Sequence, residues 1–138
     1  MSYLLDTCLL SEFKKKQPDQ KVIDWLDAQL EETLFLSTVT IGEIQKGIAR
    51  LSASKRQTEL EVWLEDLIYR YDERVLPLDT VVMRQWGQLI GTLEKQGRAL
   101  PLLDSLIAAT ALTHDLGLVT RNENDFAGTN VSLLNPWK

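Results

Sequence analysis

Hydrophobic and polar residues follow two alternating patterns along the whole chain. Short apolar runs predict five strands, at residues 3–5, 34–37, 75–76, 118–120 and 131–134. Longer segments with apolar residues three or four positions apart predict six helices, at residues 8–16, 18–30, 38–51, 52–71, 81–96 and 102–115. Pro101 stands where a first-turn proline belongs, and Gly117 is expected to end the helix that follows it.

The order of these elements predicts the fold class. Strands and helices alternate, and each strand is apolar on both faces, which is typical of a parallel sheet that helices cover on both sides. We therefore expect a three-layer α/β/α domain with a central parallel sheet of about five short strands. The chain has 138 residues and contains no repeat or linker, so a single domain over residues 1–138 is expected.

The composition excludes several kinds of protein. With one cysteine and one histidine, the chain cannot form a disulfide framework, a multi-cysteine zinc site or a pair of catalytic histidines. A net charge of −5 argues against a protein that coats nucleic acid, but not against a metal-dependent nuclease, because bound cations reverse the sign of an acidic pocket. No apolar run is long enough to span a bilayer and no signal peptide is evident, so we expect a cytoplasmic protein with no membrane partner.

Candidate chemistry lies where the predicted strands end. In open parallel sheets the active crevice lies beyond the carboxyl ends of the strands. Asp6 follows the first strand, Glu43 lies in the helix after the second, and Asp104 lies in the first turn of the sixth helix. Asp125 belongs to the polar segment that follows the fourth strand. Carboxylate oxygens without histidine or cysteine suit Mg²⁺ or Mn²⁺, which can activate water for displacement at phosphorus.

Helix capping is an alternative explanation for each acid taken alone. Acidic residues make up 20 of the 138, and the first turn of a helix favours them, so one acid near a strand end is unremarkable. The sequence context favours chemistry. Asp104 lies among leucines, isoleucine and alanines, and Glu43 lies close to Ile41 and Ile44. A carboxylate in such surroundings either lies on the wall of a pocket or is poorly solvated, and it needs a partner.

The segments that carry the four acids resemble the successive motifs of PIN-domain ribonucleases. The similarity is greatest to the VapC/FitB-like toxins of bacterial type II toxin–antitoxin pairs. The motifs are YLLDT at residues 3–7, TIGEI at 40–44, PLLDSLIAATA at 101–111 and VTRN with DF at 119–126. Because they occur in the family's order over essentially the whole chain, the match is specific. It implies a Mg²⁺- or Mn²⁺-dependent endoribonuclease, usually a homodimer, that an antitoxin encoded beside it holds inactive.

The resemblance also implies which acids bind the metal and catalyse. Asp6, Glu43 and Asp104 match the family's three core acids, and Asp125 matches its usual fourth acidic position. Asn122, Glu123 and Asn124 lie in the same loop, so the sequence leaves open which oxygen of that loop completes the site. The family pattern favours water, rather than the ribose 2′-hydroxyl, as the nucleophile, with one carboxylate assisting as general base.

Five further residues are expected to support the acids or to position the substrate: Thr7, Asn122, Lys46, Arg50 and Arg121. Thr7 resembles the small hydroxyl residue that follows the first aspartate, although helix capping explains it equally well. Asn122 matches the polar residue ahead of the fourth acid. Lys46, Arg50 and Arg121 would contact RNA phosphates from the rim of the pocket. Lys46 and Arg50 share the helical face of Glu43, and the alternative is that they simply belong to a solvated helix surface.

Two other functions remain open at this stage. The first is a PIN-like module that binds RNA or a protein partner without cleaving; the presence of all four acids favours an enzyme over it. The second is an aspartyl phosphotransferase or phospho-acceptor domain. A phosphotransferase needs a second aspartate two residues after Asp6, where this chain has Cys8, and the chain contains no glycine-rich phosphate loop.

Overall fold

The computed structural model describes residues 1–138 and contains one five-stranded sheet. Its strands are β1 (Tyr3–Leu5), β2 (Leu34–Ser37), β3 (Val75–Leu76), β4 (Gly117–Val119) and β5 (Leu133–Leu134). The order is β3-β2-β1-β4-β5, and every neighbouring pair is parallel. Because β1 lies between β2 and β4, the residues that follow these three strands meet at one edge of the sheet.

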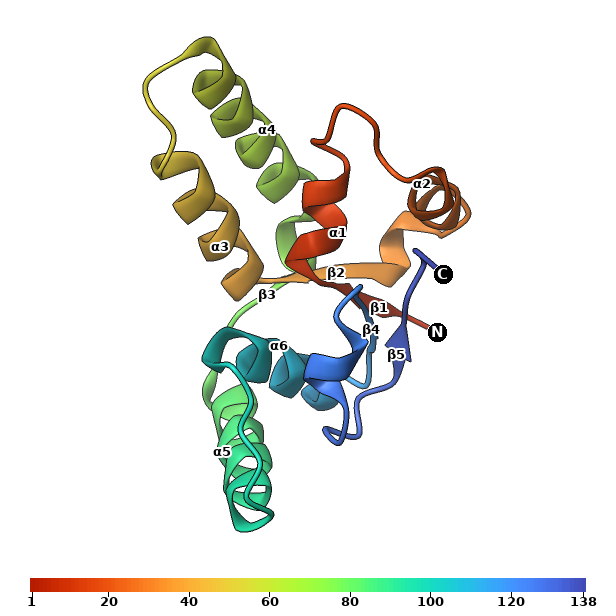
Figure 1. The fold of residues 1–138 in the computed structure, drawn as a ribbon, viewed down its shortest axis with the longest axis vertical. Coiled ribbons are helices and arrows are strands. Elements are labelled where there is room, and N and C mark those ends of the chain that lie inside the picture. The colour runs from red at the N-terminus through yellow and green to blue at the C-terminus, as the bar shows by residue number, and fades with distance from the viewer.

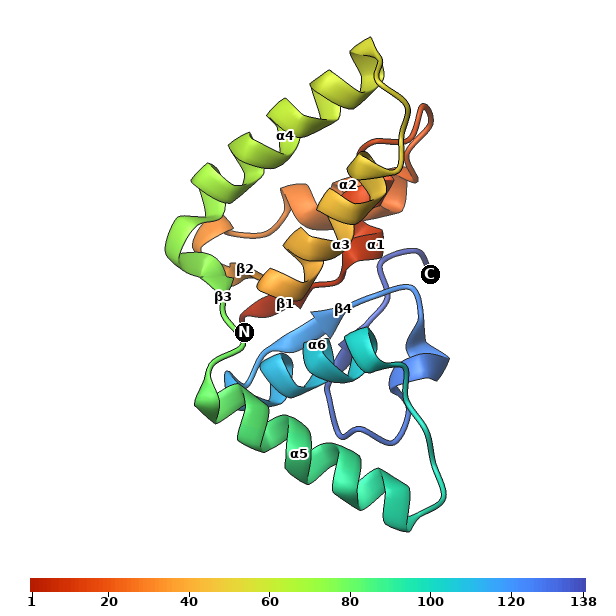
Figure 2. The same cartoon turned by 90° about the vertical axis from the view of Figure 1, so that its left-hand side faces the viewer.

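Helices cover the two faces of the sheet unequally. The helices are α1 (Thr7–Glu12), α2 (Gln20–Asp27), α3 (Thr38–Ala49), α4 (Lys55–Tyr71), α5 (Thr80–Lys95) and α6 (Leu102–Thr113). There are also three short 3₁₀ turns: η1 (Glu31–Thr33) before β2, η2 (Asp72–Arg74) between α4 and β3, and η3 (Glu123–Phe126) between β4 and β5. Figures 1 and 2 show α1 to α4 on one side of the sheet, and α5 with α6 on the other. None of these helices combines the length and the hydropathy that crossing a membrane requires.

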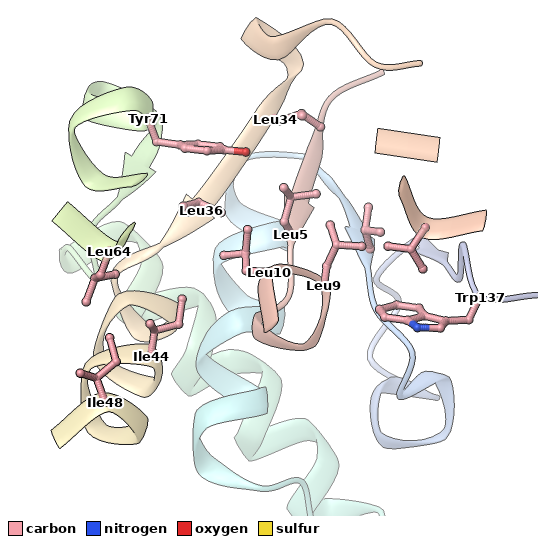
Figure 3. Close-up of a cluster of buried hydrophobic side chains, with 12 residues drawn as sticks. Leu5, Leu9, Leu10, Leu34, Leu36, Ile44, Ile48, Leu64, Tyr71 and Trp137 are labelled. Atoms are coloured by element: carbon pink, nitrogen blue, oxygen red, sulfur yellow. The ribbon is translucent and has the colours of Figure 1, made fainter. Parts of the chain in front are cut away.

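The hydrophobic core is divided in two by the sheet. Leu5 and Val119 belong to a buried cluster with side chains of α1, α3 and α4, part of which Figure 3 shows. Leu4 and Leu118, their neighbours in the same strands, belong to a second cluster with side chains of α5 and α6. Adjacent residues of the central strands therefore face opposite helical layers, which confirms the predicted three-layer α/β/α fold.

Short polar side chains begin most of the helices. The side chains of five residues accept a backbone N–H of the first turn of α1 to α5: Asp6, Asp19, Ser37, Ser54 and Asp79. Two of these caps follow strands directly, since Asp6 comes after β1 and Ser37 ends β2. The chain therefore passes from strand to helix without a loop, and this holds the first turns of α1 and α3 against the edge of the sheet.

The N-terminal helix is shorter than predicted. It ends at Glu12, not at residue 16, because the carboxylate of Glu12 accepts the backbone N–H of Asp19 at 2.9 Å and the chain turns back at once. The lysines at residues 14–16, which the predicted range includes, therefore lie outside the helix. The second and fourth helices are also shorter than predicted, and α4 begins at Lys55 behind its Ser54 cap rather than at residue 52.

The assignments of Pro101 and Gly117 were also wrong. Pro101 occupies the N-cap of α6 rather than its first turn. Asp115, with φ of 53°, lies just beyond the end of this helix, and Gly117 is the first residue of β4. A Cβ atom at Gly117 would lie 3.1 Å from side-chain atoms of Met1 and Tyr3, so the glycine permits a close approach between chain segments.

Candidate active site

The four acids singled out from the sequence come from four elements that meet at the carboxyl edge of the sheet. Asp6 follows β1 and is 5% exposed, and Glu43 is half-buried in α3. Asp104 is half-buried in the first turn of α6, and Asp125 is exposed in η3. The pKa of Asp104 is raised to about 6 and reflects how close the four acids lie. Burial is the largest cause of this shift, and the negative charges of the other three acids add to it.

The electrostatics of this cluster suit a divalent cation. None of the four carboxylates forms an ion pair with a lysine or arginine. In the present arrangement no three of them lie close enough to hold one ion between them. Like charges that face one another repel, and a cation among them would remove this repulsion. Carboxylate oxygens are also the ligands that Mg²⁺ and Mn²⁺ prefer, so the donor set fits such an ion.

Hydrogen bonds fix the orientation of Asp6. Its Oδ1 accepts the backbone N–H of Thr7 at 2.8 Å, and its Oδ2 accepts the hydroxyl of Thr120 at 2.7 Å. The backbone N–H of Asn122 donates in turn to the Thr120 hydroxyl at 3.0 Å. Thr120 was not among the site residues predicted from the sequence. The available signal was a polar residue at the end of a buried strand that runs beside β1.

A second hydrogen bond connects α1 to Glu43. The hydroxyl of Thr7 donates to Oε1 of Glu43 at 2.7 Å and lies 3.2 Å from the hydroxyl of Thr40. Thr7 does not cap a helix, because Asp6 has that role for α1. The side chain of Thr7 therefore holds the carboxylate of α3 toward the end of β1.

The loop after β4 brings Asp125, rather than Glu123, to the other acids. The carboxylate of Glu123 pairs with Nζ of Lys138 at 2.6 Å and accepts the side-chain amide of Asn135 at 3.3 Å. The hydrogen bond from Lys138 is the main reason that the pKa of Glu123 is lowered. Asp125 contributes to the raised pKa of Asp104, whereas Glu123 does not.

The three basic residues predicted to contact RNA, Lys46, Arg50 and Arg121, differ in how near they lie in the chain to an acid of the cluster. Lys46 and Arg50 are exposed in and just after α3, one and two turns beyond Glu43, and their side chains form no ion pair. Arg121 is exposed directly after Thr120, with its guanidinium 5.0 Å from the ring centroid of Trp137. Of the three, only Arg121 is the immediate neighbour in the chain of a residue that hydrogen-bonds to Asp6.

The single thiol is next to the acids but is not activated. Sγ of Cys8 lies 3.7 Å from Oδ2 of Asp6 and 3.8 Å from the hydroxyl of Thr120. Burial raises the pKa of Cys8, and the negative charge of Asp6 raises it further. The thiol is therefore protonated at neutral pH, which is unsuited to nucleophilic catalysis.

The chain matches a known protein family over most of its length. A family model described as the PIN domain matches residues 3–130, which include all four acids. The chain belongs to the PIN-domain family. The resemblance to the PIN-domain family that the four motifs carry is thereby confirmed.

Relatives of this PIN domain align over nearly its whole length. The VapC ribonuclease Y4jK of Sinorhizobium fredii is 36% identical over 136 residues, which cover 98% of this chain and 97% of that protein. Toxin FitB of Neisseria gonorrhoeae is 35% identical over 135 residues, which cover 97% of each. The crystal structure of FitAcB from Neisseria gonorrhoeae matches with a TM-score of 0.93 and 34% identity, covering 98% of both chains.

Proposed function

We propose that this PIN-domain protein is a metal-dependent endoribonuclease and the toxin of a bacterial toxin–antitoxin pair. The observation that carries the proposal is the acidic cluster, in which burial, together with the negative charges of three other carboxylates, raises the pKa of Asp104 to about 6. The names of two full-length relatives, a ribonuclease and a toxin, support RNA as the substrate and growth control as the role. Because RNA is cytoplasmic, we propose the cytoplasm as the site of action.

The proposed cofactor is Mg²⁺ or Mn²⁺, held by Asp6, Glu43, Asp104 and Asp125. Such a cation would activate water and stabilise the negative charge that develops on the phosphate. The protein supplies the rest of the chemistry. Asp6 is fixed by the Thr7 N–H and the Thr120 hydroxyl, and one of the carboxylates accepts the proton that the attacking water releases.

The first test is cleavage of a single-stranded RNA with and without divalent metal. We expect cleavage with Mg²⁺ or Mn²⁺, none after exhaustive chelation, and none from Asp6→Asn or Glu43→Gln, with folding verified by circular dichroism. Asp66→Asn is the matched control, because Asp66 is an exposed acid of α4 with no ion pair. Cleavage that persists after chelation contradicts the metal mechanism. RNA that binds without ever being cleaved favours the non-catalytic alternative.

An antitoxin partner is proposed to block the same site. A hollow of about 470 Å³ lies between α1, α2 and α4. Its apolar lining consists of Leu10, Phe13, Leu26, Leu34, Trp63, Leu67 and Tyr71. We propose that an apolar segment of the antitoxin occupies this hollow while a lysine or arginine reaches Asp6, Glu43 and Asp104. A structure of the complex in which the antitoxin contacts neither region contradicts this arrangement.

We also propose that the toxin forms a homodimer, as its family resemblance implies. Light scattering at micromolar concentration is expected to give twice the mass of one chain, which is 15.7 kDa. A monomeric mass contradicts the proposal.

A further inference from the structure

The C-terminal residues border the acidic cluster and are firmly held. Trp137 is 9% exposed and packs in the cluster that contains Leu9 (Figure 3). Its indole N–H donates to Oε1 of Glu12 at 3.0 Å, and its backbone N–H donates to Oδ1 of Asn135 at 2.9 Å. The indole ring is therefore a fixed surface beside the loop that carries Asp125.

Arg121 rests on this surface with its donors unused. Its guanidinium lies 5.0 Å from the centroid of the Trp137 ring, and the side chain is exposed and forms no ion pair or hydrogen bond in the protein. A guanidinium over an aromatic face keeps its in-plane N–H groups free to contact a phosphate. This unpaired cation directly follows Thr120, whose hydroxyl donates to Asp6.

A polar hollow of about 480 Å³ lies beside Arg121. Residues 121–125 form one part of its lining, Asn135 and Lys138 form the other, and no hydrophobic residue contributes. The hollow therefore joins Asp125, a member of the acidic cluster, to the guanidinium of Arg121, the ion pair of Glu123 with Lys138, and three side-chain amides. Amides can hydrogen-bond base edges and cations can bind phosphates, which is the chemistry that recognises a nucleotide.

We propose that this hollow is an RNA subsite for the nucleotide next to the scissile phosphate. Arg121 contacts the phosphate of that nucleotide, and Trp137 is the positioning residue that holds the guanidinium in place. The inference rests on the proposed ribonuclease function and adds the C-terminal residues to the substrate site. A cation is needed here because the acidic cluster repels the phosphates on either side of the cleavage point.

The direct test is binding of a fluorescein-labelled single-stranded RNA, measured by anisotropy with Mg²⁺ in the Asp104→Asn background. We expect Arg121→Gln to raise Kd about 10-fold, as loss of a charged hydrogen bond does. The slope of log Kd against log salt concentration should fall by about 0.7, the value for one phosphate contact on a single strand. Arg121→Lys should retain the slope. Arg84→Gln, which removes an exposed and unpaired arginine of α5, should change neither.

The role of Trp137 is tested with two substitutions that separate stacking from folding. Trp137→Leu removes the aromatic face and should raise Kd about 3- to 10-fold, because the freed guanidinium must then be immobilised on binding. Trp137→Phe keeps an aromatic face but loses the N–H that Glu12 accepts, so it should melt at a lower temperature with Kd near the starting value. In the Arg121→Gln background, Trp137→Leu should have no further effect on Kd.

Two outcomes overturn the inference. One is an Arg121→Gln protein whose Kd and salt dependence equal those of Arg84→Gln. The other is a Trp137→Leu effect of the same size with and without Arg121. A parallel assay of cleavage of the same RNA by the unmodified protein separates this inference from the proposed function. Absence of cleavage together with the expected binding changes contradicts only the proposed activity, whereas cleavage together with unchanged binding contradicts only the subsite.

Discussion

Glu12 and Asp104 are two shielded carboxylates whose pKa values are shifted in opposite directions. Glu12 is 3% exposed, and burial alone would raise its pKa. Hydrogen bonds from the Asp19 backbone, Lys15 and the Trp137 indole outweigh burial and lower the pKa to about 2. Asp104 is half-buried and faces three other acids, and its pKa is raised to about 6.

The difference shows that the groups around a buried acid, and not its burial alone, indicate whether its role is structural or functional. Glu12 is supplied with donors and stabilises the fold by joining α1, the start of α2 and the C-terminal residues. Asp104 is surrounded by like charges, and its ionised form weakens the fold of the isolated protein. A carboxylate kept in unfavourable surroundings within a cluster is a candidate for function, whereas one satisfied by donors is structural.

The largest expected effect is on RNA cleavage, which a substitution of Asp104 should reduce and a substitution of Glu12 should not. Asp104→Asn should lower RNA cleavage at least about 1,000-fold, in the range found when a group that stabilises the transition state is removed. Glu12→Gln should retain the kcat of the unmodified protein at a temperature where both are folded. Initial rates with Mg²⁺, normalised to the folded fraction from circular dichroism, make the comparison. An inactive but folded Glu12→Gln protein would show that the structural acid also serves the site.

The second expected effect is on the free energy of unfolding, to which Glu12 contributes. Glu12→Gln should lower the free energy of unfolding by about 3 kcal/mol at neutral pH, the equivalent of the shift in its pKa. Because the folded-state pKa of Glu12 is depressed, its contribution is present above its ordinary value of 4.5 and is lost as the pH falls toward 2. The difference between the two proteins in urea unfolding should therefore shrink below pH 4.5. Glu65→Gln, at an exposed position of α4, is the control and should leave stability unchanged.

The sequence could predict one of these two acids and not the other. Asp104, like Asp6 and Glu43, occupies a position relative to strand and helix that the apolar pattern defines, and a parallel sheet brings such positions to one edge. The family motifs carried the remaining information. The role of Glu12 depends on a hydrogen bond to Trp137, 125 positions away, which no local pattern indicates.

The same limit explains the errors in the helix boundaries and the missed threonine. The end of α1 was misplaced because the contact between Glu12 and Asp19 turns the chain, whereas the prediction extended the helix through the lysines at residues 14–16. The role of Thr120 depends on β4 lying directly beside β1, and a single sequence fixes the number of strands more readily than their order. A contact between residues that are not neighbours in the sequence decided each of these features.

A smaller effect concerns the stability of Asp104→Asn in the absence of metal. Its raised folded-state pKa means that protonation favours the fold, and that stability is lost as the pH rises through about 6. Asp104→Asn should therefore be about 1 kcal/mol more stable than the unmodified protein at pH 7.5 in EDTA, because solvent at the half-buried carboxylate screens part of the repulsion. At pH 4 the two should unfold alike. A lower stability at pH 7.5 would identify Asp104 as a structural hydrogen-bonding residue.

The smallest effect is the response of the melting temperature to Mg²⁺, and it compares the two acids in one experiment. A ligand that binds only the folded state stabilises it by RT ln 2, about 0.4 kcal/mol, when the Mg²⁺ concentration equals the Kd. For a chain of this size, that corresponds to a rise in Tm of roughly 1 to 2 °C. Glu12→Gln should melt at a lower temperature yet gain the same increment, because its acid lies outside the cluster. Asp104→Asn should start at a higher Tm and gain less, because one ligand and one negative charge are missing. Thermal melts of the three proteins over a Mg²⁺ series separate these behaviours, and equal increments in all three would mean that the ion binds elsewhere on the protein.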